Sequence, residues 1–278
     1  MGTEDWLRGG DPSTALSDLQ EQIRKNPSNA KLRVFLFQLL AIEGRWDRAL
    51  TQLNVAGELD AGNLAMVQTY RDALACEALR EQIFAGNRSP LIFGQPASWI
   101  ALLVEAQRLA AAGEVEQSQQ VRDQAFAAAP VTSGVIDGQP FEWIADADAR
   151  LGPMLETIIN GRYYWVPFNR IREIRLEAPA DLRDVVWMPA YFTWANGGES
   201  VGLIPTRYPG SQASADPQLR LARRTEWADR GAELFAGLGQ RMLATDAGEY
   251  PIMDARAIRL DTEATDAELD AAQSAVSA

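Results

Sequence analysis

The sequence predicts an α+β fold, in which an N-terminal all-α, tetratricopeptide-like helical repeat precedes a β-rich α+β domain. Residues 1–130 carry helical periodicity and a repeated motif, whereas residues 131–260 carry short aromatic and β-branched runs between turn residues. A chain of 278 residues fits two domains at about 150 residues each. Residues 261–278 hold five acids and no basic or aromatic residue, so we expect an acidic, disordered tail.

The helical prediction depends on an internal repeat. The segment Gly10-Asp11-Pro12-Ser13-Thr14-Ala15-Leu16 returns as Gly44-Arg45-Trp46-Asp47-Arg48-Ala49-Leu50, at an offset of 34 residues. This offset is the tetratricopeptide spacing, in which helical hairpins stack because one hairpin cannot bury its apolar face alone. Such a stack offers a concave surface to a partner peptide or helix, but few catalytic groups. Breakers and cap residues place the expected helices at 13–25, 29–43, 46–59, 63–84, 97–112 and 114–128.

Turn residues and β-branched runs define the second half. Hairpins are expected around Asp137-Gly138, Asn196-Gly197-Gly198 and Asp246-Ala247-Gly248. One helix is expected over 147–160, because its apolar residues recur at helical spacing. The expected strands lie within 135–141 and at 162–166, 173–177, 185–195, 199–204, 240–245 and 252–260.

The composition excludes several kinds of chemistry. The chain has no His and a single Cys, Cys76, which excludes His-based catalysis, imidazole zinc sites and a disulfide framework. The formal net charge of −12 repels polyphosphate, so we expect no nucleic-acid partner. No apolar run approaches the about 20 residues of a membrane span, and the acidic N-terminus is no secretory signal. We therefore expect a cytoplasmic protein without a membrane partner.

The densest polar cluster combines carboxylates with aromatic and basic residues. Its members are Trp143, Asp146, Asp148, Arg150, Glu156 and, further along, Asp184. Paired carboxylates can perform acid–base catalysis or hold a divalent cation. Acids placed before a helix can instead cap its N–H groups, and Arg150, Arg162 and Arg207 can pair with them. We favour capping and ion pairing, and we expect no metal, no cofactor and no catalytic residue.

Aromatic residues form two further clusters. The first is Tyr163-Tyr164-Trp165, and the second is built around Trp187. A continuous aromatic strand commonly buries one face in the core. Base stacking would need an accompanying basic groove, which this acidic half does not offer. We favour a core role for these residues, with a protein-binding face as the second interpretation.

Ordered motifs extend across about residues 10–260. They include 141–153, 160–168, 181–187, 205–211, 225–227 and 239–241, with Leu32-Arg33, Gly44-Arg45-Trp46 and Tyr70-Arg71 in the helical half. Together these motifs resemble the ImpE/TagJ family of type VI secretion accessory proteins. Within them, Arg207, Tyr208 and Trp227 join the residues named above as candidate structural or interaction positions.

The resemblance implies a cytoplasmic, non-enzymatic protein that works beside a contractile secretion apparatus. It implies binding to the small sheath subunit, TssB, through a short helix near that subunit's N-terminus. It also implies a role in presenting the sheath to the AAA+ ATPase ClpV. Helix recognition requires a groove that accepts apolar anchors, and the negative charge favours a partner with basic residues. The groove can lie in the helical stack or on the β-rich half.

Two alternatives stay open at this point. One is a general scaffold or chaperone that holds several secretion components through the repeat. The other is a metal-dependent enzyme that uses Asp146, Asp148, Glu156 and Asp184.

Overall fold

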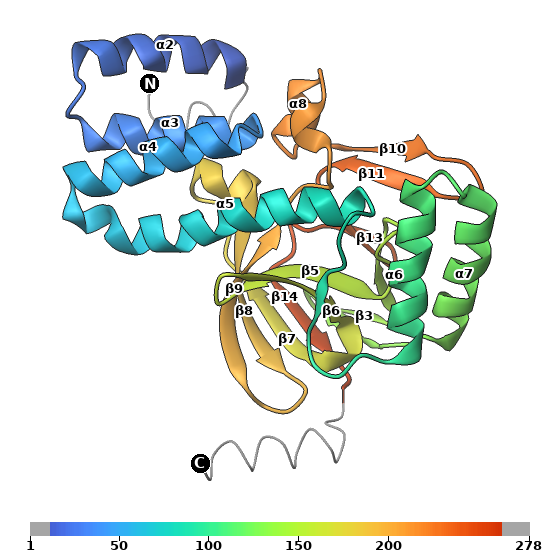
Figure 1. Cartoon of the computed structure of the whole chain (residues 1–278). Helices are drawn as coiled ribbons and strands as arrows, with labels where there is room; N and C mark the ends of the chain where they lie inside the picture. Colours follow the sequence, from blue (N-terminus) through green and yellow to red (C-terminus); the bar gives the residue numbers. More distant parts are fainter. Residues whose placement is uncertain (1–11, 263–278) are drawn as a thin grey trace.

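The computed structural model describes residues 12–262, and nearly all of the predicted tail lies outside them. The first half is helical, as predicted. Its helices are α2 (Pro12–Lys25), α3 (Ala30–Ile42), α4 (Trp46–Leu59), η1 (Ala61–Asn63), α5 (Leu64–Phe84), α6 (Ser98–Ala111) and α7 (Val115–Ala128). Figure 1 shows that α2 to α5 stack in chain order, whereas α6 and α7 form a separate hairpin beyond the end of α5. No helix within 12–262 is long and apolar enough to cross a membrane.

Local sequence signals set the ends of these helices. Asn29 caps α3 by accepting hydrogen bonds from the backbone N–H groups of Lys31 (3.0 Å) and Leu32 (3.4 Å). Gly44, with φ at +66°, turns the chain between α3 and α4. All residues from 36 to 42 in α3 are buried, as expected for a helix in the middle of a stack.

A nine-stranded sheet forms the body of the second half, in the order β1-β6-β5-β9-β8-β7-β14-β2-β3. Its strands are β1 (Leu91–Ile92), β2 (Gly134–Ile136), β3 (Gln139–Phe141), β5 (Met154–Ile159), β6 (Arg162–Pro167), β7 (Ile171–Leu176), β8 (Trp187–Trp194), β9 (Glu199–Pro205) and β14 (Ala257–Leu260). Strand β1 comes from the loop between α5 and α6 and pairs parallel with β6, while all the other neighbours pair antiparallel. The helical half therefore supplies one edge of the sheet.

Two smaller sheets and several short helices complete the fold. The three-stranded sheet contains β4 (Ile144–Asp146), β12 (Met242–Thr245) and β13 (Glu249–Pro251), and β10 (Thr225–Asp229) pairs with β11 (Phe235–Gly239). The short helices are η2 (Phe168–Arg170), η3 (Leu182–Val185), η4 (Ser211–Ala213) and α8 (Pro217–Arg220). These elements, together with the helical first half, confirm the predicted α+β class.

The three predicted hairpin turns are confirmed. Asp137 and Gly138, with φ at +48° and +86°, join β2 to β3 in the left-handed conformation that a tight hairpin requires. Residues 195–198 join β8 to β9, and residues 246–248 join β12 to β13. The partner predicted for the last hairpin, 252–260, was wrong. Strand β13 ends at Pro251, and β14 pairs instead with β2 and β7.

The helix predicted over 147–160 was also wrong. A turn is followed there by β5, all six residues of which are buried. A strand with both faces buried lacks polar alternation, so its run of apolar residues can imitate helical spacing. Gly152, with φ at +51°, and the following Pro153 also interrupt any helix at this point.

The apolar core continues from the helices into the main sheet. Trp187 of β8 packs against Tyr70 of α5 at 5.6 Å between ring centroids, and Phe84 of α5 packs against Trp165 of β6 at 5.8 Å. A second cluster fills the opposite face of the sheet, where Leu243 of β12 and Ile252, which follows β13, lie. The main sheet is therefore covered on both faces. The division into domains 1–130 and 131–260 stays a prediction, and one core cluster crosses that boundary.

Candidate functional site

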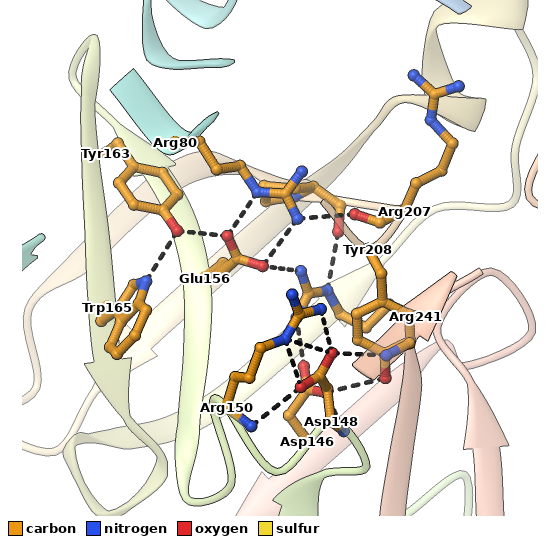
Figure 2. Close-up of polar contacts among 12 residues, drawn as sticks. Arg80, Asp146, Asp148, Arg150, Glu156, Tyr163, Trp165, Arg207, Tyr208 and Arg241 are labelled. Atoms are coloured by element: carbon orange, nitrogen blue, oxygen red, sulfur yellow. Dashed lines mark hydrogen bonds and ion pairs between the residues drawn. The ribbon is translucent and has the colours of Figure 1, made fainter. Parts of the chain in front are cut away.

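A buried network of charged side chains joins α5, the main sheet and the small sheet (Figure 2). At its centre is Glu156 of β5, whose side chain is fully buried. Its carboxylate accepts hydrogen bonds from Arg80 Nε (2.5 Å) and Nη2 (2.9 Å), from Arg241 Nη2 and from the Tyr163 hydroxyl. The Trp165 indole N–H donates in turn to the Tyr163 oxygen at 2.8 Å. Two arginines and a tyrosine therefore satisfy one carboxylate.

Arg241 connects this carboxylate to a second one. Its guanidinium donates to Asp146 through Nη1, to Glu156 through Nη2, and to a backbone carbonyl through Nε at 2.9 Å. Asp146, the last residue of β4, also accepts from the Tyr208 hydroxyl and from the backbone N–H of Asp148, each at 2.9 Å. The side chains of Arg241 and Asp146 are both fully buried. Arg241, which directly precedes β12 of the small sheet, therefore ties that sheet to Glu156 of β5.

Asp148 forms a third centre, in the turn after β4. Its fully buried carboxylate accepts from Arg150 Nη2 at 2.5 Å and from the backbone N–H groups of Arg150 (2.9 Å) and Gly237 (2.8 Å). The guanidinium of Arg150 lies 5.0 Å from the ring centroid of Phe84 in α5, within cation–π range. Asp148 thereby links the turn to strand β11, and Arg150 extends this link to the end of α5.

The network also reaches the ends and faces of the helices. Arg207 donates to the carbonyls of the last two residues of α3, at 2.8 and 3.3 Å. Such carbonyls lack partners within the helix, and a cation at this end complements the helix dipole. The carbonyl of Arg207 itself accepts from Arg80 at 2.7 Å. Glu77 of α5 accepts from the Trp187 indole at 3.0 Å and pairs with Arg80 at 3.4 Å.

The formal charges of the network cancel. Its members are Arg80, Arg150, Arg207 and Arg241 with Glu77, Asp146, Asp148 and Glu156. Burial raises the pKa of Asp146 to about 6, because desolvation outweighs the attraction of Arg241. Burial also acts to raise the pKa of Glu156, but Arg80 and Arg241 together lower it to about 2. Asp146 is therefore the first of these two carboxylates to take up a proton on acidification.

The network contains three of the four acids considered for catalysis. The fourth, Asp184, accepts from the backbone N–H groups of Ala180 and Asp181, each at 2.9 Å, in a capping box at η3. All four acids are thus occupied by arginines or backbone N–H groups. Within residues 12–262, no three His, Cys, Asp or Glu side chains are arranged to hold a metal ion.

The roles expected for individual residues need correction. No helix follows Asp146 and Asp148, so they bind N–H groups of a turn and of β11 instead of capping a helix. Arg162 was expected to pair with an acid, but it is exposed at the start of β6 and forms no ion pair with any described residue. Arg207 binds carbonyl groups instead of acids.

The aromatic candidates divide between the interior and the surface. Those in the interior are Tyr163, Trp165, Trp187 and Tyr208. Tyr164 is half-buried, and its ring meets Phe93 edge-on at 5.9 Å. Trp143 and Trp227 are exposed by 40% and 38%, and Trp227 packs one side on Tyr208 at 5.6 Å. The two exposed indoles lie outside the charge network.

Sequence reasoning missed Glu77, Arg80 and Arg241. The buried face of α5 runs through Tyr70, Ala73 and Leu74 to Glu77 and Arg80. Two charged residues on an otherwise apolar helical stripe are a signal of buried pairing, because an unpaired charge is rarely buried. Arg241 lies in one of the ordered motifs, but its spacing alone indicates no partner.

Comparisons with known proteins cover most of the chain. Residues 138–259 match the sequence profile of the family described as ImpE protein. The chain is 54% identical over 267 residues to the type VI secretion system accessory component TagJ of Pseudomonas aeruginosa, covering 96% of this chain and 93% of that protein. The fold is similar to the crystal structure of protein VPA1032 from Vibrio parahaemolyticus, with a TM-score of 0.84 at 25% identity. That match covers 94% of this chain and 97% of the other.

Proposed function

The chain belongs to the ImpE/TagJ family of type VI secretion accessory components, and we propose that it is a non-enzymatic, cytoplasmic adaptor within such a system. Its proposed partner is the small sheath subunit, TssB, recognised through a short helix near that subunit's N-terminus. By holding this helix, the adaptor assists recognition or recycling of the sheath by the ClpV ATPase.

One observation carries the proposal: the 54% identity to a type VI accessory component, which extends over 96% of this chain. The identity includes the helical half as well as the region of the ImpE profile, so it covers every element around the charge network. The occupied state of the four candidate acids also supports the non-enzymatic part of the proposal. Each of these carboxylates already accepts at least two hydrogen bonds from arginines, tyrosines or backbone N–H groups, which favours a structural role over substrate or metal binding.

Titration calorimetry tests the proposal directly. The ligand is a synthetic peptide that spans the N-terminal helix of the small sheath subunit encoded with this chain, and a scrambled peptide is the control. We expect saturable binding of the native peptide alone, stronger at low than at high ionic strength because the protein is acidic. Absence of binding at high micromolar peptide would contradict the adaptor role. Co-purification of other secretion components after deletion of the sheath-subunit helix would favour a general scaffold.

A further inference from the structure

Strand β10 leaves one edge of its two-stranded sheet open. Within residues 12–262 its strand partner is β11 alone. On its other side β11 is held to the body of the protein, because Gly237 and Gly239 donate their backbone N–H groups to Asp148 and Ser211, each at 2.8 Å. Figure 1 shows β10 as the outer strand of this pair. We propose that the open edge of β10 pairs with β10 of a second copy of this chain, antiparallel about a twofold axis.

The ladder between β10 and β11 determines which backbone groups point outward. Backbone N–H groups of Gln240 and Arg230 donate to the carbonyls of Arg224 and Leu234, at 3.0 and 2.8 Å. Residues of an antiparallel ladder alternate between hydrogen-bonded and non-hydrogen-bonded pairs, so the even-numbered residues of β10 bond to β11. The backbone groups of residues 225, 227 and 229 therefore point to the open edge, and they form no hydrogen bond with another element of the described chain. An edge of this kind is a template for strand pairing.

Charge selects one register for the pairing of two copies. The outward-facing residues of both copies align when the twofold axis passes through residue 226, 227 or 228. An axis at Glu226 sets that residue opposite its own copy, and an axis at 227 sets Arg224 opposite Arg230 of the second copy, so both oppose like charges. An axis at Ala228 instead sets Glu226 opposite Arg230 of the second copy, and symmetry repeats this pair on the other side of the axis. The complementary register also places a small side chain on the axis.

Glu226 and Arg230 are available for these pairs. Both are exposed, and the side chain of Arg230 forms no hydrogen bond or ion pair with any residue in 12–262. Glu226 pairs with Arg224 of its own chain at 2.6 Å, but about half of each side chain is exposed, and exposed pairs contribute little. Arg224 also keeps Asp216 as a partner. Glu226 can therefore turn to the second copy at little cost.

The other face of the joined sheet brings two indoles together. Trp227 is 38% exposed, and one side of its ring packs on Tyr208 at 5.6 Å. With the axis at Ala228, Trp227 lies opposite Asp229 of the second copy and diagonal to Trp227 of that copy. Aromatic side chains span this diagonal separation. Residues 227 and 229 then exchange backbone hydrogen bonds on both sides of the axis.

The size of the interface sets the expected strength. Stable complexes bury about 1,200–2,000 Å², and pairing confined to two strands of five residues buries less. We therefore expect a dimer that dissociates at micromolar or higher concentrations. Such a dimer carries two copies of every binding surface of the protomer, which makes it bivalent toward a partner that repeats.

Exchange of charges across the axis tests the register. Glu226→Arg opposes two arginines, and Arg230→Glu opposes two glutamates. We expect each single substitution to weaken dimerisation about tenfold, because symmetry changes two cross-strand pairs at once. The double variant with both substitutions restores opposite charges and dimerises as the wild type does. Arg162→Glu is the matched control, because Arg162 is likewise an exposed arginine beside a turn, without an ion pair among the described residues, and lies outside the hairpin.

Sedimentation velocity of the full chain across a series of concentrations measures dimerisation, and circular dichroism confirms that each variant is folded. Hydrogen exchange locates the interface, since we expect the amides of Trp227 and Asp229 to become protected as concentration rises. A wild type that stays monomeric at high micromolar concentration would overturn the proposal, as would single variants that dimerise like the wild type. A double variant as weak as the single ones would overturn the register. Protection of these amides only after addition of the small sheath subunit would refute the second copy as occupant and assign the edge to that subunit.

Discussion

Replacing Glu156 by glutamine tests how far the buried network stabilises the fold. The substitution keeps the shape of the side chain, removes its charge and changes one acceptor oxygen into an NH₂ donor. Arg80 and Arg241 both donate to this carboxylate, as does Tyr163. In the variant, donors therefore face a donor inside the protein, and each arginine loses part of its compensating charge.

The structure sets the expected magnitude. Removal of one partner from a buried ion pair costs about 3–5 kcal/mol, because the remaining charge stays buried. Arg241 keeps Asp146, and Arg80 keeps Glu77, so we expect a loss of about 4 kcal/mol, in the middle of that range. Native proteins are stable by about 5–15 kcal/mol in total, so this is a large share. At about 2–4 °C per kcal/mol, Tm falls by about 8–16 °C.

Thermal unfolding followed by circular dichroism at neutral pH measures this loss. The matched control is Glu105→Gln, because Glu105 pairs with Arg108 at 2.7 Å while about half of each side chain is exposed. Exposed pairs contribute little after solvent screening, so the control unfolds at the wild-type temperature. A Tm for Glu156→Gln equal to that of the control would refute the reasoning, since the network would then add nothing to stability.

Three further predictions concern protonation, the lone thiol and one turn. The stabilisation from Glu156 is full at pH values above the ordinary pKa of a glutamate, and it is lost as pH falls toward about 2. The stabilisation from Asp146 depends on pH in the opposite sense: it is full at acidic pH and is lost as pH rises through about 6. Asp146→Asn therefore removes the decline in the free energy of urea unfolding that the wild type shows as pH rises to about 6. A variant with the same pH profile as the wild type would contradict the raised pKa of Asp146. Burial raises the pKa of Cys76 to about 12, so iodoacetamide labels this thiol only in unfolded protein; rapid labelling of native protein would disprove its burial. Gly152→Ala, whose Cβ would lie 2.5 Å from an aromatic ring of α7, costs about 1–3 kcal/mol more in urea unfolding than Gly138→Ala, which has open space. Equal losses for the two alanine variants would show that the ring moves aside freely.

The parts of the fold that depend on near neighbours in sequence could be predicted. Asn29 and Gly44 act within one helical turn, and Asp137-Gly138 determines its hairpin within four residues. The local pair of Asp148 with Arg150 was within reach of prediction, whereas the long-range part of the network was not, because its partners are distant: Arg80 is 76 residues from Glu156 in the chain. The helix prediction over 147–160 was wrong because β5 is buried on both faces and therefore lacks the polar alternation that identifies a strand.

The position of Arg80 constrains how homologous chains can diverge. The ImpE profile covers residues 138–259, so Glu156 and Arg241 lie inside it while Arg80 lies outside. A lineage that loses the arginine at 80 leaves a buried carboxylate at 156 with one arginine fewer. Replacement of the whole set by apolar residues can cost little, whereas replacement of one member costs much. We therefore expect positions 80, 156 and 241 to vary together among homologous chains.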